Sequence, residues 1–266
     1  MSATTESQEV TVIAHRGLAS GLPENTLAAF RGAIALGVDA IEIDLRVTAD
    51  GHVVVMHDDT VDRTTDGHGR VADLTLAEIK TLDAGRYAGP AFGGERVPTY
   101  GEVLEALQGS RMQLLLDIKD CPLDAIAAVV ELTGRYSATR EVIVGPRTVA
   151  DLRAFKKLDP RLRELALVPG RQDAPPDLAA ITEFVAAGAD LIRLWPAWIL
   201  TDDETGAHLV RTVLDLGTPV WTCADTLYGD ISADAPEDDL RRLVDAGVSG
   251  IMTNLPELLR DIVRAR

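Results

Sequence analysis

The sequence predicts an α/β protein: a single (β/α)8 TIM barrel over residues 1–266, with a small insertion after the second strand. Two observations support this fold class. Short β-branched apolar runs alternate with amphipathic stretches along nearly the whole chain, which is typical of parallel strands joined by helical crossovers. Eight such units within 266 residues match the size of this barrel. No Gly-rich phosphate turn follows the first run, which disfavours a doubly wound sheet.

The expected elements follow the apolar periodicity. Barrel strands are predicted at residues 12–16, 40–45, 114–119, 142–147, 165–169, 191–196, 220–224 and 250–254. Helices are predicted at 26–36, 100–107, 123–133, 149–158, 178–187, 204–216, 237–246 and 256–264. Glycines such as Gly37 and Gly217 stand where helices should end, and Asn25 is predicted to cap the first helix.

An insertion is predicted because about seventy residues separate the second apolar run from the third. Asp50-Gly51 between two apolar runs indicates a tight hairpin, so residues 53–57 should return antiparallel to the second strand. With these two residues at the centre of the turn, His57 should lie opposite Asp44. The insertion, at about residues 47–98, should also contain a short helix at 76–82 and a Gly-rich loop at 85–94.

Composition excludes several classes of partner. The chain has 26 Lys and Arg against 42 Asp and Glu, a net charge of −16, which opposes binding to nucleic acid or to an anionic membrane surface. No apolar run is long enough to cross a bilayer, and residues 1–9 lack the features of a secretory signal. The two cysteines, Cys121 and Cys223, fit a reducing compartment and small apolar core positions. We therefore expect a cytoplasmic protein, monomeric or homodimeric.

Polar side chains gather at the ends of the first three predicted barrel strands and of the hairpin. They are His15 and Arg16 on the first strand, Glu42 and Asp44 on one face of the second, Asp117 and Lys119 on one face of the third, and His57 in the hairpin. The carboxyl ends of barrel strands meet at one face, where active sites are built. Charged residues within such strands need partners or a metal ion. The sequence thus predicts a site there.

The three carboxylates of Glu42, Asp44 and Asp117 offer the oxygen ligands that Mg²⁺ or Ca²⁺ prefers, and no cluster of His and Cys favours zinc. Glu42 and Asp44 could alternatively pair internally with Arg46 or Lys119. The metal reading predicts a divalent cofactor, Mg²⁺ or Ca²⁺ with Mn²⁺ as an alternative.

The basic residues indicate phosphate chemistry. Arg16 offers a planar fork for phosphate oxygens and Lys119 a point charge. His15 and His57 can act as an acid and a base because imidazole titrates near neutrality. Together with a metal ion, these groups predict proton transfer and phosphoryl chemistry on a small-molecule phosphodiester.

Tryptophan positions near strand ends leave alternatives open. Of Trp195, Trp198 and Trp221, the last is the best candidate to line a substrate pocket, although a core position is equally compatible. Arg193 shares a strand face with Trp195 and either faces the site or pairs with a neighbouring acid.

Several motifs, in this order, resemble those of the glycerophosphodiester phosphodiesterase family. They are AHRG (14–17), PENT (23–26), IEIDL (41–45), TADG (48–51) and VMHD (55–58), followed by DRTT (62–65), VPT (97–99), LDIK (116–119), WT (221–222) and GVSGIMT (247–253). The resemblance covers nearly the whole chain and is most specific in the first half. It implies the barrel with its insertion.

The resemblance also implies roles for individual residues. Glu42, Asp44 and the third-strand carboxylate would bind the metal ion, and His15 and His57 would form the acid–base pair. Arg16 and Lys119 would hold the phosphate. The implied reaction cleaves a glycerophosphodiester to glycerol 3-phosphate and an alcohol, through attack of the adjacent glycerol hydroxyl and a cyclic phosphate that water opens.

Two positions depart from the family pattern. Asp117 stands where the family usually has Glu, and Asn254 where the last strand commonly ends with Asp. Residues 191–198 match no family motif and could set leaving-group specificity. The alternatives are a lysophospholipase D-like hydrolase, a phosphodiester-binding barrel impaired in catalysis by Asp117, and a metal-dependent lyase or isomerase. Aromatic residues at only 4% argue against the broad apolar mouth of the first.

Overall fold

The computed structural model describes residues 10–119, 123–170, 177–201, 205–225 and 235–266. The strands are β1 (Thr11–Ala14), β2 (Ala40–Val47), β3 (Val53–Val55), β4 (Gln113–Ile118), β5 (Val142–Gly145), β6 (Arg163–Leu167), β7 (Leu191–Leu194), β8 (Val220–Cys223) and β9 (Gly250–Thr253). The α-helices are α1 (Leu27–Leu36), α2 (Leu76–Ile79), α3 (Tyr100–Ala106), α4 (Leu123–Arg135), α5 (Val149–Leu158), α6 (Leu178–Ala186), α7 (Pro196–Ile199), α8 (Thr205–Asp215), α9 (Glu237–Asp245) and α10 (Pro256–Arg264). Every predicted strand and helix is present in part or in full, and α7 was not expected.

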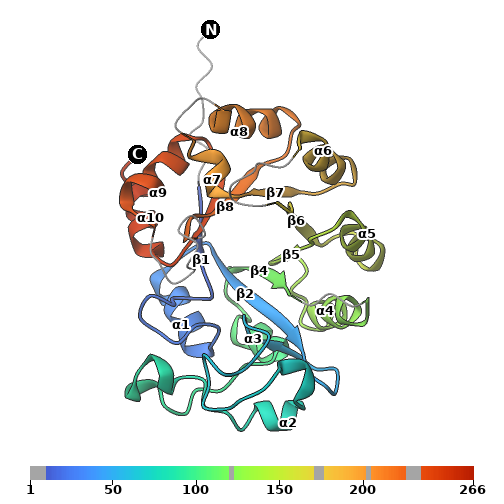
Figure 1. Ribbon diagram of the computed structural model, residues 1–266, viewed down its shortest axis with the longest axis vertical. Helices are drawn as coiled ribbons and strands as arrows, with labels where there is room; N and C mark the ends of the chain where they lie inside the picture. Colours follow the sequence, from blue (N-terminus) through green and yellow to red (C-terminus); the bar gives the residue numbers. More distant parts are fainter. Residues whose placement is uncertain (1–9, 120–122, 171–176, 202–204, 226–234) are drawn as a thin grey trace.

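Eight of these strands form a closed parallel barrel. The strand order is β1-β9-β8-β7-β6-β5-β4-β2, and β2 pairs with β1 to close it. Figure 1 shows the helices around the outside, with the insertion, which contains α2, as a lobe at the bottom of the view next to α3. The predicted (β/α)8 barrel is therefore confirmed.

Side chains of the barrel strands alternate between two cores. Those facing inward form a small inner cluster that includes Ile13, Ala40, Leu115 and Trp221. Those facing outward, such as Ile41 and Ile43, pack against the helices in the main core. Because Glu42 and Asp44 have the same parity as Ala40, both carboxylates point into the barrel.

The start of α1 differs from the prediction. Thr26, not Asn25, caps this helix: its hydroxyl accepts a hydrogen bond from the amide of Ala29 at 3.3 Å. Asn25 has a left-handed backbone with φ of 56°, and its side chain turns toward the barrel instead. The helix ends as expected at Gly37, whose φ of 74° suits a left-handed cap.

The hairpin between β2 and β3 is present, but its register is one residue different from the prediction. Leu45 pairs with Val55 and Val47 with Val53, because residues 49–51 form a three-residue loop with Gly51 at φ of 82°. Asp44 therefore faces Met56, whose amide donates to the Asp44 carbonyl at 3.0 Å. The expected cross-strand pair of His57 with Asp44 is wrong.

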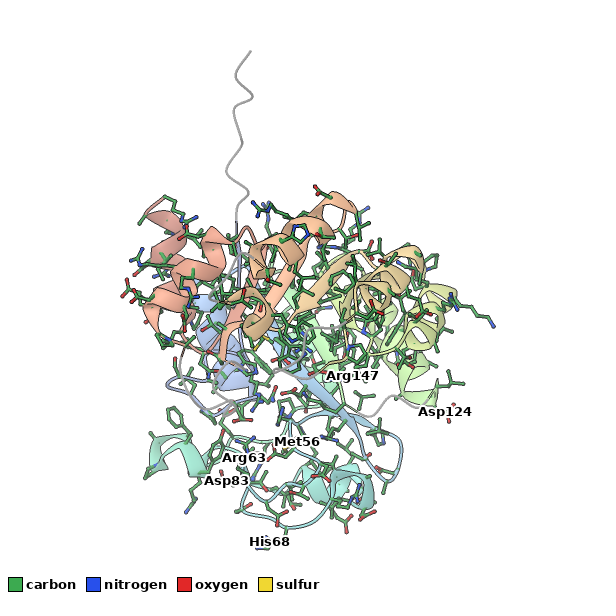
Figure 2. All side chains as sticks on the ribbon, turned by 45° about the horizontal axis from the view of Figure 1, so that its top comes forward. Met56, Arg63, His68, Asp83, Asp124 and Arg147 are labelled. Atoms are coloured by element: carbon green, nitrogen blue, oxygen red, sulfur yellow. The ribbon has the colours of Figure 1, made fainter. Side chains whose placement is uncertain are left out.

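The insertion has a small core of its own. Seven buried apolar residues of the insertion pack together: Val54, Met56, Val61, Val71, Ile79, Ala84 and Val97. The predicted helix at 76–82 is limited to α2, and the Gly-rich loop contains two short 3-10 helices, Arg86–Ala88 and Pro90–Phe92. Figure 2 shows Met56 and Arg63 on the side of this lobe nearer the barrel and His68 at its far edge.

Within the described residues, no helix combines the length and the apolar character needed to cross a membrane. The predicted signal-free segment 1–9 and Cys121 lie outside the described residues. Cys223 is buried among the inward-facing side chains, as predicted.

Candidate active site

The loop after β1 brings Arg16 into the mouth of the barrel, the end at which the carboxyl ends of the strands lie. Arg16 has a positive φ of 55°, a strained backbone of the kind often found at functional sites. Two hydrogen bonds hold its backbone: its amide donates to Glu42 Oε2 at 3.1 Å, and its carbonyl accepts from the amide of Asn25 at 3.0 Å. Gly17 follows with φ of 83°, and a Cβ there would lie 2.8 Å from Ala29 Cβ. Only glycine fits this turn.

Three carboxylates converge inside the mouth. Glu42, Asp44 and Asp117 each contribute an oxygen to a group whose members all lie within 4.8 Å of one another. Asp44 and Asp117 are direct neighbours in the register of β2 and β4. This all-oxygen set could hold a divalent metal ion of the Mg²⁺ or Ca²⁺ type. The shorter side chain of Asp117 still reaches the group.

Cations surround these carboxylates. Lys119 Nζ lies 2.8 Å from Asp44 Oδ1 and 2.6 Å from Asp117 Oδ2, while Arg16 Nε lies 3.3 Å from Asp44 Oδ2. Arg147, which the sequence analysis did not single out, pairs with the other oxygen of Asp117. Figure 2 shows Arg147 near the end of the barrel that faces the insertion.

The carboxylates differ in how easily they ionise. Burial opposes the charge of Asp44, but Lys119 and Arg16 outweigh it and hold its pKa well below the usual range. Burial, and then the neighbouring charge of Asp44, raises the pKa of Glu42 to about 8. Two buried carboxylates this close repel each other, and a divalent cation between them would favour the ionised form of both.

Asn25 is a site residue that the sequence analysis assigned to another role. Its Nδ2 donates to Asp44 Oδ2 at 2.8 Å. The left-handed backbone that removes Asn25 from the helix cap is what directs this amide to Asp44. One sequence feature could have indicated this role: Asn25 lies between Glu24 and Thr26 in the PENT motif, which is part of the family resemblance.

His15 is held by residues that follow β8 and β9, and β9 lies directly beside β1 in the barrel. Its Nδ1 lies 3.0 Å from Asn254 Oδ1 and 3.4 Å from Asp225 Oδ2. Asp225 is fully buried and accepts from the amide of Asn254 at 2.7 Å and from the Thr253 hydroxyl at 3.2 Å. Burial works to lower the pKa of His15, but the hydrogen bond to Asp225 and the charge of Glu42 outweigh it, so the pKa is raised.

His57 follows β3 and is fixed by a chain of charges. Its Nδ1 lies 2.7 Å from Asp58 Oδ1, and its carbonyl accepts two bonds from Arg46, at 2.8 and 3.0 Å. Arg63 then joins Asp58 to Glu24, with bonds of 2.6 Å and 2.8 Å. Burial lowers the pKa of His57, and the nearby charges of Arg16 and Lys119 act in the same direction while Asp44 opposes them.

Trp221 lies inside the barrel. Its ring covers Gly250 on the next strand, where a Cβ would lie 2.6 Å from the indole nitrogen. Together with Arg193 it lines a small cavity of about 20 Å³, which also borders Glu42 and Asp117. Trp221 therefore belongs to the inner core and borders the carboxylate group, while its contact with a substrate stays a prediction.

The structure brings all eight predicted residues to the mouth of the barrel: His15, Arg16, Glu42, Asp44, His57, Asp117, Lys119 and Trp221. Among the described residues that contact them, several were not predicted as site residues: Glu24, Asn25, Asp58, Arg147, Asp225 and Asn254. Asp225 was within reach of sequence reasoning, since it follows the end of β8 with the same alternation as the inward-facing Trp221 and Cys223.

A TIM barrel that gathers two histidines, three carboxylates and several cations at this end is typical of the class of TIM-barrel hydrolases that act on phosphodiesters. The comparison with known proteins gives the family. Residues 15–258 match the Glycerophosphoryl diester phosphodiesterase family, so the chain belongs to this family and is a phosphoric diester hydrolase.

Individual relatives agree along almost the full length of the chain. A glycerophosphodiester phosphodiesterase of Caldanaerobacter subterraneus is 35% identical over 256 residues, covering 95% of this chain and 97% of that protein. One from Bacillus subtilis is 32% identical, covering 95% and 86%. The crystal structure of the Agrobacterium tumefaciens enzyme superimposes with a TM-score of 0.76 at 26% identity, covering 95% and 99%. An Oleispira antarctica phosphodiesterase, in complex with the product sn-glycerol-3-phosphate, gives 0.80 at 25% identity, with 96% of each chain covered.

Proposed function

We propose that this protein hydrolyses glycerophosphodiesters to glycerol 3-phosphate and an alcohol, with a divalent metal ion held by Glu42, Asp44 and Asp117. The observation that carries the proposal is the convergence of these three carboxylates beside Lys119 and Arg16. The Oleispira antarctica phosphodiesterase, whose structure is of a complex with the product sn-glycerol-3-phosphate, supports the same class of substrate.

Mg²⁺ or Ca²⁺ suits the oxygen donors best, with Mn²⁺ as an alternative. When bound, such an ion would stabilise negative charge on the phosphate oxygens. Asp117 contributes an oxygen to the group despite its short side chain, because Lys119 and Arg147 hold it in place. This geometry argues against a barrel that only binds its ligand.

Arg16 and Lys119 would orient the phosphate, each sharing its charge between Asp44 and a phosphate oxygen. Trp221 would form part of the pocket wall. With the phosphate in place, the neighbouring glycerol hydroxyl attacks phosphorus, the new O–P bond closes a cyclic phosphate, and the bond to the leaving alcohol breaks.

The two histidines would move the protons. Carboxylates hold both at Nδ1, so Nε2 is the nitrogen available for exchange. The lowered pKa of His57 favours the neutral base that takes the proton of the attacking hydroxyl, and the raised pKa of His15 favours the acid that protonates the leaving alcohol. Their roles reverse when water opens the cyclic phosphate.

The proposal is tested by incubating the purified protein with glycerophosphocholine and Mg²⁺, Mn²⁺ or Ca²⁺, and measuring glycerol 3-phosphate. We expect metal-dependent product that a chelator abolishes. Measurable substrate binding without product in any metal would instead support the impaired, phosphodiester-binding barrel. A 2-deoxyglycerol analogue, which lacks the attacking hydroxyl, should bind without turnover if the cyclic route is correct.

Release of choline from a long-chain lysophosphatidylcholine tests the lysophospholipase D-like alternative. We expect it to be slow, since the described mouth is lined by charged groups. The cytoplasmic location and the monomeric or dimeric state remain predictions, to be checked by cell fractionation and by light scattering.

A further inference from the structure

The end of β7 presents a cation stacked on an indole beside the proposed site. Arg193 and Trp195 stand two residues apart, and the guanidinium carbon of Arg193 lies 4.3 Å from the centre of the Trp195 ring. Trp198 meets Trp195 edge-on, with ring centres 6.4 Å apart, and so limits its movement. This is the segment that the family resemblance did not cover.

Arg193 also belongs to the wall of the proposed site. It lines the same cavity as Glu42, Asp117 and Trp221. Its register partners are Trp221 on β8 and Leu167 on β6, so it stands across the barrel from the carboxylates on β2 and β4. A substrate whose phosphate is held by Arg16 and Lys119, beside the carboxylates, can therefore extend toward Arg193.

Two buried donors at this place have no partner. Arg193 Nε and Trp195 Nε1 are both shielded from solvent, and neither finds a hydrogen-bond acceptor in the described chain. Nor does Arg193 form an ion pair there, whereas Lys119, Arg16 and Arg147 each pair with a carboxylate. Buried polar groups without partners are rare in folded proteins and unfavourable, so these two donors require an explanation.

A ligand with acceptor oxygens would satisfy both donors, while a quaternary ammonium would not. Stacking places the charge of Arg193 over a face of Trp195, the surface that would otherwise attract such a cation. A choline group has no hydrogen-bonding atom to offer Nε or Nε1, and its charge has the same sign as the guanidinium. Hydroxyl or carboxylate oxygens have neither disadvantage.

We propose that Arg193 and Trp195 form a leaving-group subsite that selects phosphodiesters whose alcohol carries acceptor oxygens, over those that release choline. This inference rests on the proposed function, because it assigns the alcohol side of the same substrate. Polyol and carboxylate-bearing alcohols share the recognised chemistry, and glycerophosphoglycerol and glycerophosphoserine represent the two in the experiment.

The experiment compares kcat/KM for glycerophosphoglycerol, glycerophosphoserine and glycerophosphocholine in the wild type and in Arg193→Met, Trp195→Phe and Arg211→Met. Methionine keeps the length of the side chain without its charge, and phenylalanine keeps a ring without the N–H donor. Arg211 is an exposed arginine on α8 and serves as the matched control. Melting temperatures of all four proteins are recorded alongside.

We expect the wild type to prefer at least one oxygen-bearing leaving group over choline by about tenfold or more, the size of one hydrogen bond to a charged group. Arg193→Met should remove most of this preference by lowering kcat/KM for the preferred substrate while leaving glycerophosphocholine unchanged or improved. Trp195→Phe should lower the preference by a few-fold, and Arg211→Met should leave it unchanged. A preference that Arg193→Met abolishes only for glycerophosphoserine would assign the subsite to carboxylates.

Other outcomes overturn the subsite. These are a wild type that prefers glycerophosphocholine, or an Arg193→Met variant that loses the same factor with all three substrates, as expected for a purely structural or phosphate-binding arginine. If Arg193→Met does not fold, Arg193→Lys keeps the charge without the Nε donor and should retain only part of the preference. A wild type that turns over none of the substrates would instead contradict the proposed function.

Discussion

Asp225 lies 3.4 Å from Nδ1 of His15, although the two residues come from opposite ends of the chain. The carboxylate is fully buried and also accepts bonds from the amide of Asn254 and the hydroxyl of Thr253. These bonds hold Asp225 in one position, and Asp225 with Asn254 holds the imidazole. Asn254 stands after β9 where the family resemblance predicts an Asp. The negative charge beside His15 comes instead from Asp225, just after β8.

Asp225→Asn should lower kcat by about 10- to 100-fold with little change in KM, the range seen when a group that orients a functional histidine is lost. Removing the carboxylate removes the contact that raises the pKa of His15. If His15 donates a proton, activity is lost as pH rises through its pKa, so the alkaline limb of the kcat profile should move to lower pH. The pH profile of kcat checks this shift. Asp245→Asn, at an exposed carboxylate, is the control, and an unshifted profile would assign Asp225 a purely structural role.

The assignment of acid and base predicts different responses to the leaving group. A p-nitrophenyl ester of glycerol phosphate releases an alcohol that needs no protonation. His15→Ala should therefore recover much of its lost rate with this substrate, measured as the first burst of nitrophenol, whereas His57→Ala should not. Metal affinity, measured by calorimetry without substrate, should change little in either variant. Recovery by His57→Ala alone would reverse the two roles.

Asp117→Glu should shift the metal preference toward Mg²⁺. The added methylene brings the carboxylate closer to the ligand group, and Mg²⁺ requires shorter and more regular contacts than Ca²⁺. Activation curves with Mg²⁺, Mn²⁺ and Ca²⁺ measure the change, and titration of the metal alone measures affinity. Asp117→Ala is the reference for a lost ligand. An identical metal profile in Asp117→Glu and the wild type would count against Asp117 as a ligand.

Much of this site could be predicted from the sequence because strand alternation is a local property. Glu42 and Asp44 are two residues apart, as are Asp117 and Lys119, so the members of each pair share one face of a strand, whichever strands lie beside it. The register of the hairpin could not be fixed in this way. Asp50-Gly51 occurs in loops of two or three residues, and a change of one residue moves His57 from opposite Asp44 to the position beyond it.

Contacts that form only when the barrel closes could not be predicted from the sequence either. Asp225 meets His15 only because β9 and β1 are neighbours, and β8 follows β9 in the sheet. Arg147 reaches Asp117 because β5 lies beside β4. The residue type of Asn25 predicts a helix cap. Its left-handed backbone, which is held by contacts with Arg16 and Asp44, directs its side chain to the site instead.

Gly17→Ala and Gly51→Ala form a matched pair for the role of the Arg16 turn. Both glycines have nearly the same backbone, with φ of 83° and 82°. A Cβ at Gly51 meets open space, so Gly51→Ala should lower the free energy of unfolding by only about 1–2 kcal/mol, the strain of a left-handed residue. A Cβ at Gly17 meets the backbone and side chain of Ala29, so Gly17→Ala should be more destabilising and should also raise KM by displacing Arg16. Urea unfolding and steady-state kinetics test both variants. Equal stability losses with unchanged KM would contradict the account.

Glu164 lies outside the proposed site, and ionisation of its buried carboxyl should lower the free energy of unfolding as pH rises. It is fully buried on β6, and its nearest cation is Lys156, with Nζ 3.4 Å from Oε2. Burial raises its pKa to about 7, with Lys156 opposing and Asp190 adding to the shift. A carboxyl whose pKa is higher in the folded than in the unfolded protein stabilises the fold below the unfolded pKa, and this stabilisation is lost as pH rises through 7.

Glu164→Gln, which cannot ionise, should therefore unfold with a higher free energy than the wild type at pH about 8, by up to roughly 3 kcal/mol, and the difference should shrink toward pH about 5. Urea unfolding at both pH values measures it, with Glu183→Gln on the exposed face of α6 as the control. A difference of equal size at both pH values would show that packing, and not ionisation, is responsible.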